Sequence, residues 1–209
     1  MLNKKRFILN NRYLDESPTS GISMGHAVAV CGMPGSGKGE FAEIIATNGI
    51  PVRSMGDMVR AEVKARGIAG SPTVYGDVAA DLRAKYGEDV LAIRLADEVT
   101  ELMKSHPLVL IEGMRGTAEF EIFNSRWQPN FSSVAIIADQ EIRFQRTQTR
   151  GRSEDGDREQ FHIREQREAG WGLYSLIESA DFTLNNESTL DDLEKLADKW
   201  LEDFTKNNL

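Results

Sequence analysis

The chain has 209 residues, of which 40% are hydrophobic and 28% are charged, and its formal net charge is −8. This composition indicates one globular domain, and the acidic balance argues against a nucleic-acid-binding surface, which needs clustered Lys and Arg. No apolar run approaches the roughly 18–20 residues of a membrane span, and the single cysteine, Cys31, excludes an intrachain disulfide and indicates a reduced, cytoplasmic setting.

Residues 1–23 differ in character from the rest of the chain. Lys4-Lys5-Arg6 is a charged start, but Phe7-Ile8-Leu9 is too short for the apolar core of a signal peptide, which needs about 7–15 residues. Polar residues follow as far as Gly21. We expect residues 1–23 to form a disordered tail, with one folded domain over residues 24–209 and Met24 as an alternative start of translation.

The next stretch has the pattern of a strand, a glycine-rich turn and a helix. An apolar run at residues 27–31 precedes the turn, and Phe41, Ile44 and Ile45 follow it at helical spacing. Glycines let consecutive backbone N–H groups converge on an anion, and a helix start adds its positive dipole end. In this context G-x4-G-K predicts a phosphate-binding loop for a nucleoside triphosphate. Its predicted residues are Gly32, Met33, Pro34, Gly35, Ser36, Gly37, Lys38, Gly39 and Glu40.

Strands and helices alternate along the remainder. We expect strands at residues 50–53, 107–111, 134–138 and 182–184, of which 107–111 is a continuous apolar run typical of a strand buried on both faces. Helical patterns cover residues 55–66, 74–85, 91–103, 118–123, 140–148, 159–169 and 190–204. The sequence therefore predicts an α/β fold, a three-layer αβα sandwich around a five-stranded parallel sheet, with ligands beyond the carboxyl ends of the strands.

Two segments resemble the nucleoside monophosphate kinases, adenylate kinase above all. The first is the loop Pro34-Gly-x-Gly-Lys-Gly, although Glu40 stands where that family has Thr, either near the phosphates or turned away from them. The second is Ser54-Met55-Gly56-Asp57-Met58-Val59-Arg60. The resemblance implies that Arg60 grips the phosphate of an acceptor and that Asp57 lies near the waters of Mg²⁺. A solvated pair of Asp57 and Arg60 is the alternative.

The segment Ile111-Glu112-Gly113-Met114-Arg115 is similar to a further adenylate-kinase motif, shortened by one residue. A carboxylate at the end of a buried strand beside a phosphate loop suits water-mediated binding of Mg²⁺, so Glu112 is predicted as a metal-site residue. The resemblance implies that Arg115 is a second clamp on the acceptor and that Glu119 reads the acceptor base. Solvation on a helix face is the alternative for Glu119.

Arginines cluster before and after a polar loop at residues 151–157. Steps of three and four place Arg143, Arg146 and Arg150 on one helix face, which we expect to face an anion. The resemblance implies that Arg146 and Arg150 serve the adenine and phosphates of ATP and that residues 150–158 form a short lid. Arg152 follows, and Arg164 and Arg167 either complete this cage or form a solvated surface.

These resemblances place residues 24–209 in the nucleoside-monophosphate-kinase group of P-loop proteins, near the archaeal adenylate-kinase-like family of uncertain substrate. They imply ATP and Mg²⁺ as cofactors, an acceptor-binding insertion at about 54–88, and Lys38, Arg115, Arg146 and Arg150 as catalytic residues. The implied function is phosphoryl transfer to a nucleoside monophosphate such as AMP. The segment 180–190 also resembles dephospho-CoA kinases, the second alternative. A nucleotide-switched module with weak ATPase activity, acting on a protein or ribonucleoprotein partner, is the third.

Overall fold

Five parallel strands form the centre of the computed structural model, which describes residues 24–71, 73–152 and 155–209. The strands lie in the order β2-β3-β1-β4-β5. Their bounds are β1 (His26–Cys31), β2 (Val52–Ser54), β3 (Leu108–Glu112), β4 (Phe131–Ile137) and β5 (Phe182–Asn185). The expected tail at residues 1–23 lies outside the described residues, as do residue 72 of the expected insertion and residues 153–154 of the expected lid.

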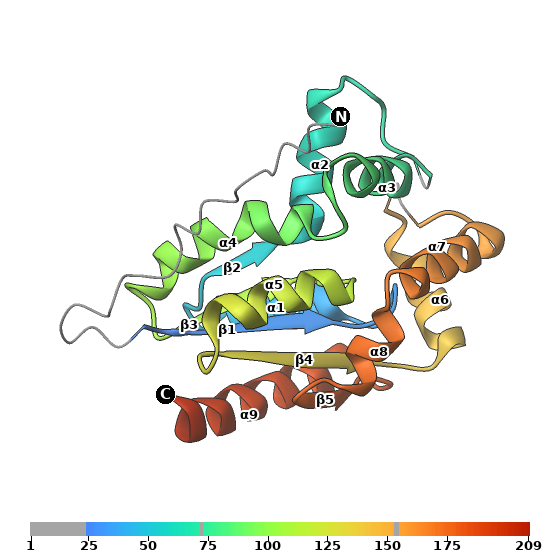
Figure 1. Cartoon of the computed structure of the whole chain (residues 1–209). Coiled ribbons are helices and arrows are strands. Elements are labelled where there is room, and N and C mark those ends of the chain that lie inside the picture. The colour runs from blue at the N-terminus through green and yellow to red at the C-terminus, as the bar shows by residue number, and fades with distance from the viewer. Residues whose placement is uncertain (1–23, 72, 153–154) are drawn as a thin grey trace, which may run out of the picture.

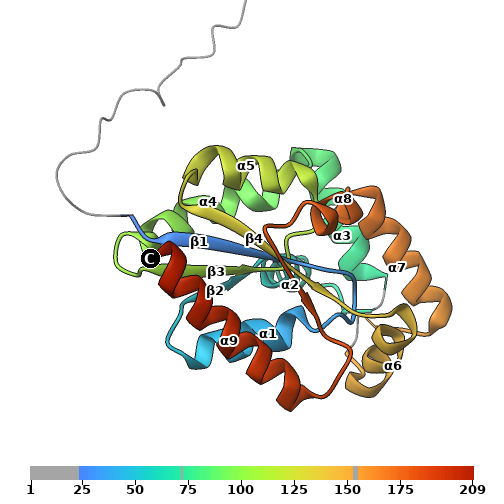
Figure 2. The ribbon, with the colours of Figure 1, turned by 90° about the horizontal axis from the view of Figure 1, so that it is seen from below.

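Helices cover both faces of the sheet (Figures 1 and 2). One face packs against α1 (Lys38–Thr47) and α9 (Leu190–Asn208), through Phe41, Trp200 and Phe204. The other face packs against α4 (Val90–Met103), α5 (Thr117–Trp127) and α8 (Leu173–Glu178). The predicted α/β fold, a three-layer sandwich of the P-loop NTPase type, is therefore confirmed. Among the described helices, none is long and apolar enough to cross a membrane.

Four further helices lie toward the carboxyl ends of the strands, as Figure 1 shows. They are α2 (Met55–Ala65), α3 (Val74–Tyr86), α6 (Gln140–Arg150) and α7 (Arg158–Gly170). Parallel strands that leave the sheet at one edge bring their following loops together there. This edge therefore carries the phosphate loop, the start of α2, Glu112 and the start of α6.

Two departures from the sequence prediction have a clear physical cause. Strand β4 begins at Phe131 because the hydroxyls of Ser132 and Ser133 have buried partners: Ser132 Oγ lies 2.9 Å from His26 Nε2, and Ser133 Oγ donates to Asp181 over 3.0 Å. Hydroxyl groups that have hydrogen-bond partners can be buried at little cost. From composition alone, however, serines are expected to face solvent. Helix α8 was not predicted, because six residues are too few for a helical period to be recognised.

Candidate active site

The phosphate loop depends on backbone geometry that only glycine adopts easily. Gly35 and Gly37 have φ angles of 80° and 99°, in the left-handed region. A Cβ on Gly35 would lie 2.4 Å from the carbonyl oxygen of Arg143, and one on Gly37 would lie 2.2 Å from Asn186 Nδ2. No side chain caps the start of α1, so its first N–H groups stay available to an anion.

Lys38 lies folded back along this loop. Its Nζ donates to the carbonyl oxygens of Gly32 and Met33 over 2.6 Å and 3.1 Å. Burial lowers the pKa of Lys38 to about 8, although Glu168 and Glu112 act in the opposite direction. The ammonium group is thus held at the phosphate loop. Burial there penalises its positive charge, and a bound anion would offset that penalty.

Arg143 supports the loop from behind. Its guanidinium donates to the carbonyl oxygens of Pro34 (3.1 Å) and Ala138 (3.0 Å) and forms a buried ion pair of 2.6 Å with Glu165. The expectation that Arg143 shares one anion-facing stripe with its neighbours on α6 is therefore wrong. Arg143 and Arg146 point in directions that differ by only a few tens of degrees around the helix. That difference is enough to place one side chain against the loop and the other in a pocket.

Arg146 and Arg150 lie farther along α6 and do face a pocket. Arg146 donates to the carbonyl oxygens of Asn186 and Ser188 over 2.8 Å and 2.9 Å, which ties α6 to the turn after β5. Asn186 in turn donates to the carbonyl oxygen of Ser36 over 2.9 Å. Arg150 donates twice to Asp155, over 2.8 Å and 2.6 Å. Both arginines line a cavity between α6, the turn and the start of α9, which we call the outer pocket.

A second cavity, the phosphate pocket, extends from the loop to the ends of β2 and β3. Lys38, Glu40 and Arg150 line it together with most of the predicted phosphate and acceptor residues. The remaining charged residues of its lining are Glu43, Asp57, Arg60, Glu112, Arg115, Arg152 and Arg164. Arg146 lines the outer pocket and not this one.

Two carboxylates in the phosphate pocket are candidates for Mg²⁺. The sheet register places Glu112 beside Ser54, whose hydroxyl donates to Glu112 over 2.8 Å. Asp57 accepts from Arg60 over 2.7 Å and 3.0 Å. The described residues contain no group of three His, Cys, Asp or Glu side chains that could hold a metal alone. Mg²⁺ needs only one or two carboxylates when phosphates and waters complete its octahedron, so these residues fit it.

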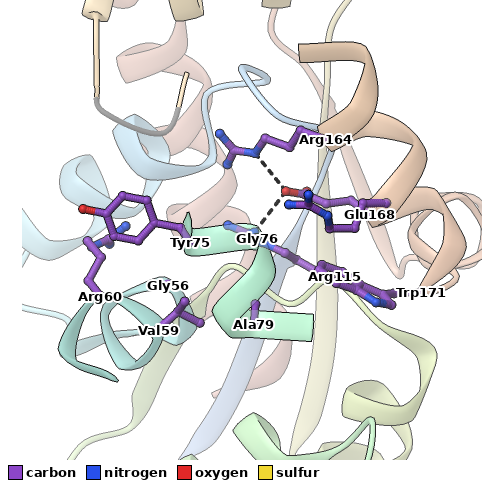
Figure 3. Close-up of a pocket in the computed structure, with 11 residues that line it drawn as sticks. Gly56, Val59, Arg60, Tyr75, Gly76, Ala79, Arg115, Arg164, Glu168 and Trp171 are labelled. Carbon is purple, nitrogen blue, oxygen red and sulfur yellow. Dashed lines mark hydrogen bonds and ion pairs between the residues drawn. The ribbon is translucent and has the colours of Figure 1, made fainter. Parts of the chain in front are cut away.

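A third cavity, the inner pocket, lies between α2, α3 and α7 (Figure 3). Arg60, Arg115 and Arg164 line it and also the phosphate pocket, so the two cavities meet at these side chains. Its other lining residues are Gly56, Val59, Tyr75, Gly76, Ala79, Arg167, Glu168 and Trp171. Four arginines against one carboxylate make this cavity strongly electropositive, a setting suited to an anionic ligand.

Glu168 stands at the centre of the inner pocket. Its Oε1 accepts from Arg115 and from Arg164, each over 3.0 Å (Figure 3). Burial alone would raise the pKa of Glu168, but the charges of Arg115, Arg164 and Lys38 lower it to about 2. The carboxylate is therefore ionised at every physiological pH.

Glu119 lies behind this pocket and does not line it. One oxygen forms a buried ion pair of 2.6 Å with Arg83, and the other accepts from the backbone N–H groups of Arg115 and Gly116 over 2.8 Å and 3.1 Å. The alternative of a solvated helix residue is wrong, because the side chain is fully buried. The observed contacts give Glu119 the task of fixing the loop that carries Arg115, in place of the expected contact with a base.

Several residues of the site were not anticipated from the sequence. Tyr75, Trp171 and Glu168 line the inner pocket, and Asp155 holds Arg150. Only Glu168 had a local signal, since it lies four residues after Arg164 on the same helix. Asp155 lies only five residues from Arg150, but in a loop, where no helical period pairs the two. Tyr75 joins the pocket from a segment far from α7 in the chain.

Comparison with known sequences gives a consistent picture. A family model described as an AAA domain matches residues 28–169. A UPF0200 protein of Methanosarcina barkeri is 40% identical over 169 residues, which cover 80% of this chain and 90% of that protein. A UPF0200/UPF0201 protein of Archaeoglobus fulgidus is 38% identical over 181 residues, and this chain spans 56% of its length.

Two solved structures share the fold. A Thermus thermophilus protein, TT1252, superposes with a TM-score of 0.60 at 20% identity, covering 87% of this chain and 98% of that chain. Shikimate kinase from Acinetobacter baumannii, solved with shikimate, gives a TM-score of 0.55 at 18% identity, covering 88% of this chain and 96% of its own. At these identities the likenesses show the fold alone.

Proposed function

This chain belongs to the UPF0200 family and carries an AAA domain, and we propose that it is a kinase that transfers a phosphoryl group from ATP to a small nucleotide-type acceptor. A nucleoside monophosphate such as AMP is the first choice of acceptor. The likeness of the phosphate loop and of the segment from Ser54 to Arg60 to adenylate kinases supports this choice.

One observation carries the proposal: the phosphate pocket and the inner pocket share Arg60, Arg115 and Arg164 in their linings. A protein that only binds or hydrolyses ATP needs a phosphate pocket but no second electropositive cavity beside it. Phosphoryl transfer needs both, because two polyanions must be brought together in line and their mutual repulsion neutralised. The position of these arginines between two cavities is therefore what a kinase requires.

The residues divide the work as follows. Lys38 and the amide groups of the loop hold the phosphates of ATP, with Arg146 and the turn after β5 on the nucleoside side. Arg60 and Arg115 hold the anionic group of the acceptor. Arg150 and Arg164 stabilise the charge on the migrating phosphoryl group. Mg²⁺, held through water by Glu112 and Asp57, supplies further positive charge at the phosphates.

We therefore assign Arg146 a role in binding ATP and not the catalytic role that the resemblance implied. It lines the outer pocket and not the phosphate pocket. Residues at about 54–88 serve as the acceptor-binding insertion in this proposal. Residues at about 150–158 serve as the lid.

A panel of acceptors tests the proposal. The full chain is incubated with Mg-ATP and each of the common nucleoside monophosphates, dephospho-CoA or shikimate, and phosphorylated products are separated by ion-exchange chromatography. The proposal predicts a new product with at least one nucleotide acceptor and none with the Lys38→Ala variant. A product with dephospho-CoA alone would favour the second reading from the sequence. ADP formed at one slow rate under every condition would instead indicate a nucleotide-switched module that acts on a macromolecular partner.

A further inference from the structure

The two carboxylate oxygens of Glu168 differ in their surroundings. Oε1 accepts from both Arg115 and Arg164 over 3.0 Å, as the dashed lines of Figure 3 mark. Oε2 is buried and accepts no hydrogen bond within the described part of the chain. A buried acceptor without a donor is costly, more so when it is charged. This oxygen therefore needs a hydrogen-bond donor that the described part of the chain does not provide.

The other fully buried carboxylate of this region has a complete set of donors. Glu119 accepts on one oxygen from Arg83 and on the other from the backbone N–H groups of Arg115 and Gly116. The chain itself thus satisfies both oxygens of Glu119. Glu168 is the one of the two that lines a cavity, and it is the one left with an open oxygen.

A second open group lies next to it. Arg164 Nη1 is buried and lies 3.5 Å from Asp155 Oδ1, an ion-pair contact that is too long for a hydrogen bond. An acceptor oxygen and a donor nitrogen without hydrogen-bond partners thus occur on residues that are bonded to each other. A ligand that carries hydroxyl groups can supply a donor for the oxygen and an acceptor for the nitrogen, because a hydroxyl group is able to do either.

We propose that Glu168 Oε2 accepts a hydrogen bond from a hydroxyl group of the phosphoryl acceptor, so that the acceptor is a hydroxylated anion, either a ribonucleotide or a sugar phosphate. This inference rests on the proposed kinase function and specifies the substrate class of the inner pocket. Oε2 is closed off from solvent, so side chains that line the inner pocket must move to admit the acceptor. Arg167 of that lining contacts the exposed Asp77 only over 3.5 Å, so it can move aside without breaking a buried ion pair.

The rest of the pocket supports recognition by charge and hydroxyl groups. Among the described residues, its lining contains four arginines, Glu168, Tyr75 and Trp171, but no Asn, Gln, Ser, Thr or His side chain. Neutral side chains of those types are the usual readers of the edge of a base. The pKa of Glu168, about 2, keeps it a hydrogen-bond acceptor and makes it too weak a base to take a proton. Its part is therefore to orient the acceptor.

Calorimetric titration without ATP tests the contact. The full chain is titrated with AMP, with 2′,3′-dideoxy-AMP and with ribose 5-phosphate. The wild type is expected to bind AMP at least about tenfold more tightly than the dideoxy analogue, the factor for a hydrogen bond to a charged group. Ribose 5-phosphate binding as tightly as AMP assigns the site to a sugar phosphate, and weaker binding assigns it to a ribonucleotide.

Glu168→Gln reverses the polarity at the contact. Because Arg115 and Arg164 both donate, the amide oxygen will face them and the NH₂ group will replace Oε2. The preference for AMP over its dideoxy analogue should then fall to about onefold. Glu168→Asp keeps the charge but withdraws it by one methylene, so the preference should fall there too, and this variant decides if the Gln variant fails to fold. Glu159→Gln, at an exposed position of the same helix, should keep the wild-type preference.

Equal binding of AMP and its dideoxy analogue to the wild type, or no binding of any probe, would overturn the contact. An undiminished preference in the Asp variant would do the same. The kinase function stands or falls separately, on the appearance of a phosphorylated product. Transfer to AMP without any hydroxyl preference would refute the contact alone, and a hydroxyl preference without transfer to any acceptor would refute the kinase alone.

Discussion

Replacing Glu119 by Gln should destabilise the protein strongly. The side chains of Glu119 and Arg83 are 0% and 3% exposed, and their ion pair spans 2.6 Å. Arg83 also lies 4.1 Å from the centroid of the Trp171 ring, so it stays in place when its partner loses charge. Breaking a buried pair on one side costs about 3–5 kcal/mol, because the remaining charge stays buried without compensation. We expect a loss of this size in the free energy of unfolding.

Denaturant titration of the full chain measures this loss as a lower midpoint at an unchanged slope. Glu121→Gln, an exposed position on the same helix, is the matched control and should change the stability by less than about 0.5 kcal/mol. The measurement also separates the two assignments of Glu119. A loss below about 1 kcal/mol, together with a tenfold rise in the acceptor KM, would refute the structural role and restore the contact with the acceptor base.

Three further predictions concern the pockets. Burial lowers the pKa of Lys38 to about 8, and bound phosphate will raise it. ATP binding near pH 8 should therefore take up about half a proton, and the affinity for ATP should fall as the pH rises further. Calorimetry in buffers of different ionisation enthalpy measures the proton uptake, and its absence would contradict the prediction. Arg60→Ala should raise the acceptor KM about tenfold or more and change the ATP KM little, since a charge-assisted contact contributes about 1.5–3 kcal/mol. Steady-state kinetics with each substrate varied in turn measures both constants. A raised ATP KM with an unchanged acceptor KM would show that the assignments of the ATP and acceptor pockets are reversed. Arg150→Ala should lower the turnover number roughly a hundredfold, about 3 kcal/mol, with a smaller loss of ATP affinity; a loss confined to affinity would count against a role in transfer.

Local sequence signals predicted the fold and the phosphate loop because the determinants are local. The glycines, Lys38 and the apolar run before them lie within about a dozen residues of one another. Strand alternation with helices then fixes the edge of the sheet at which ligands bind. The same reasoning correctly brought Arg60, Glu112 and Arg115 to that edge.

The partners of Arg143 and Arg115 could not be predicted, because they come from distant parts of the chain. Arg143 contacts Pro34, which is 109 positions away, and Arg115 contacts Glu168 across 53 positions. Spacing along one helix says which residues share a face but not what that face meets. A buried partner such as Glu165 turned Arg143 away from the pocket, whereas Glu168 holds Arg115 at it.

The destination of the γ-phosphoryl group tests the central claim most directly. A single turnover of γ-labelled Mg-ATP is followed by rapid quench, in the presence of the best acceptor from the panel and in its absence. If the shared arginines lie between donor and acceptor, the label should appear in the acceptor, and much faster than it appears as inorganic phosphate. Label found only in inorganic phosphate, at one rate with or without any acceptor, would contradict the account.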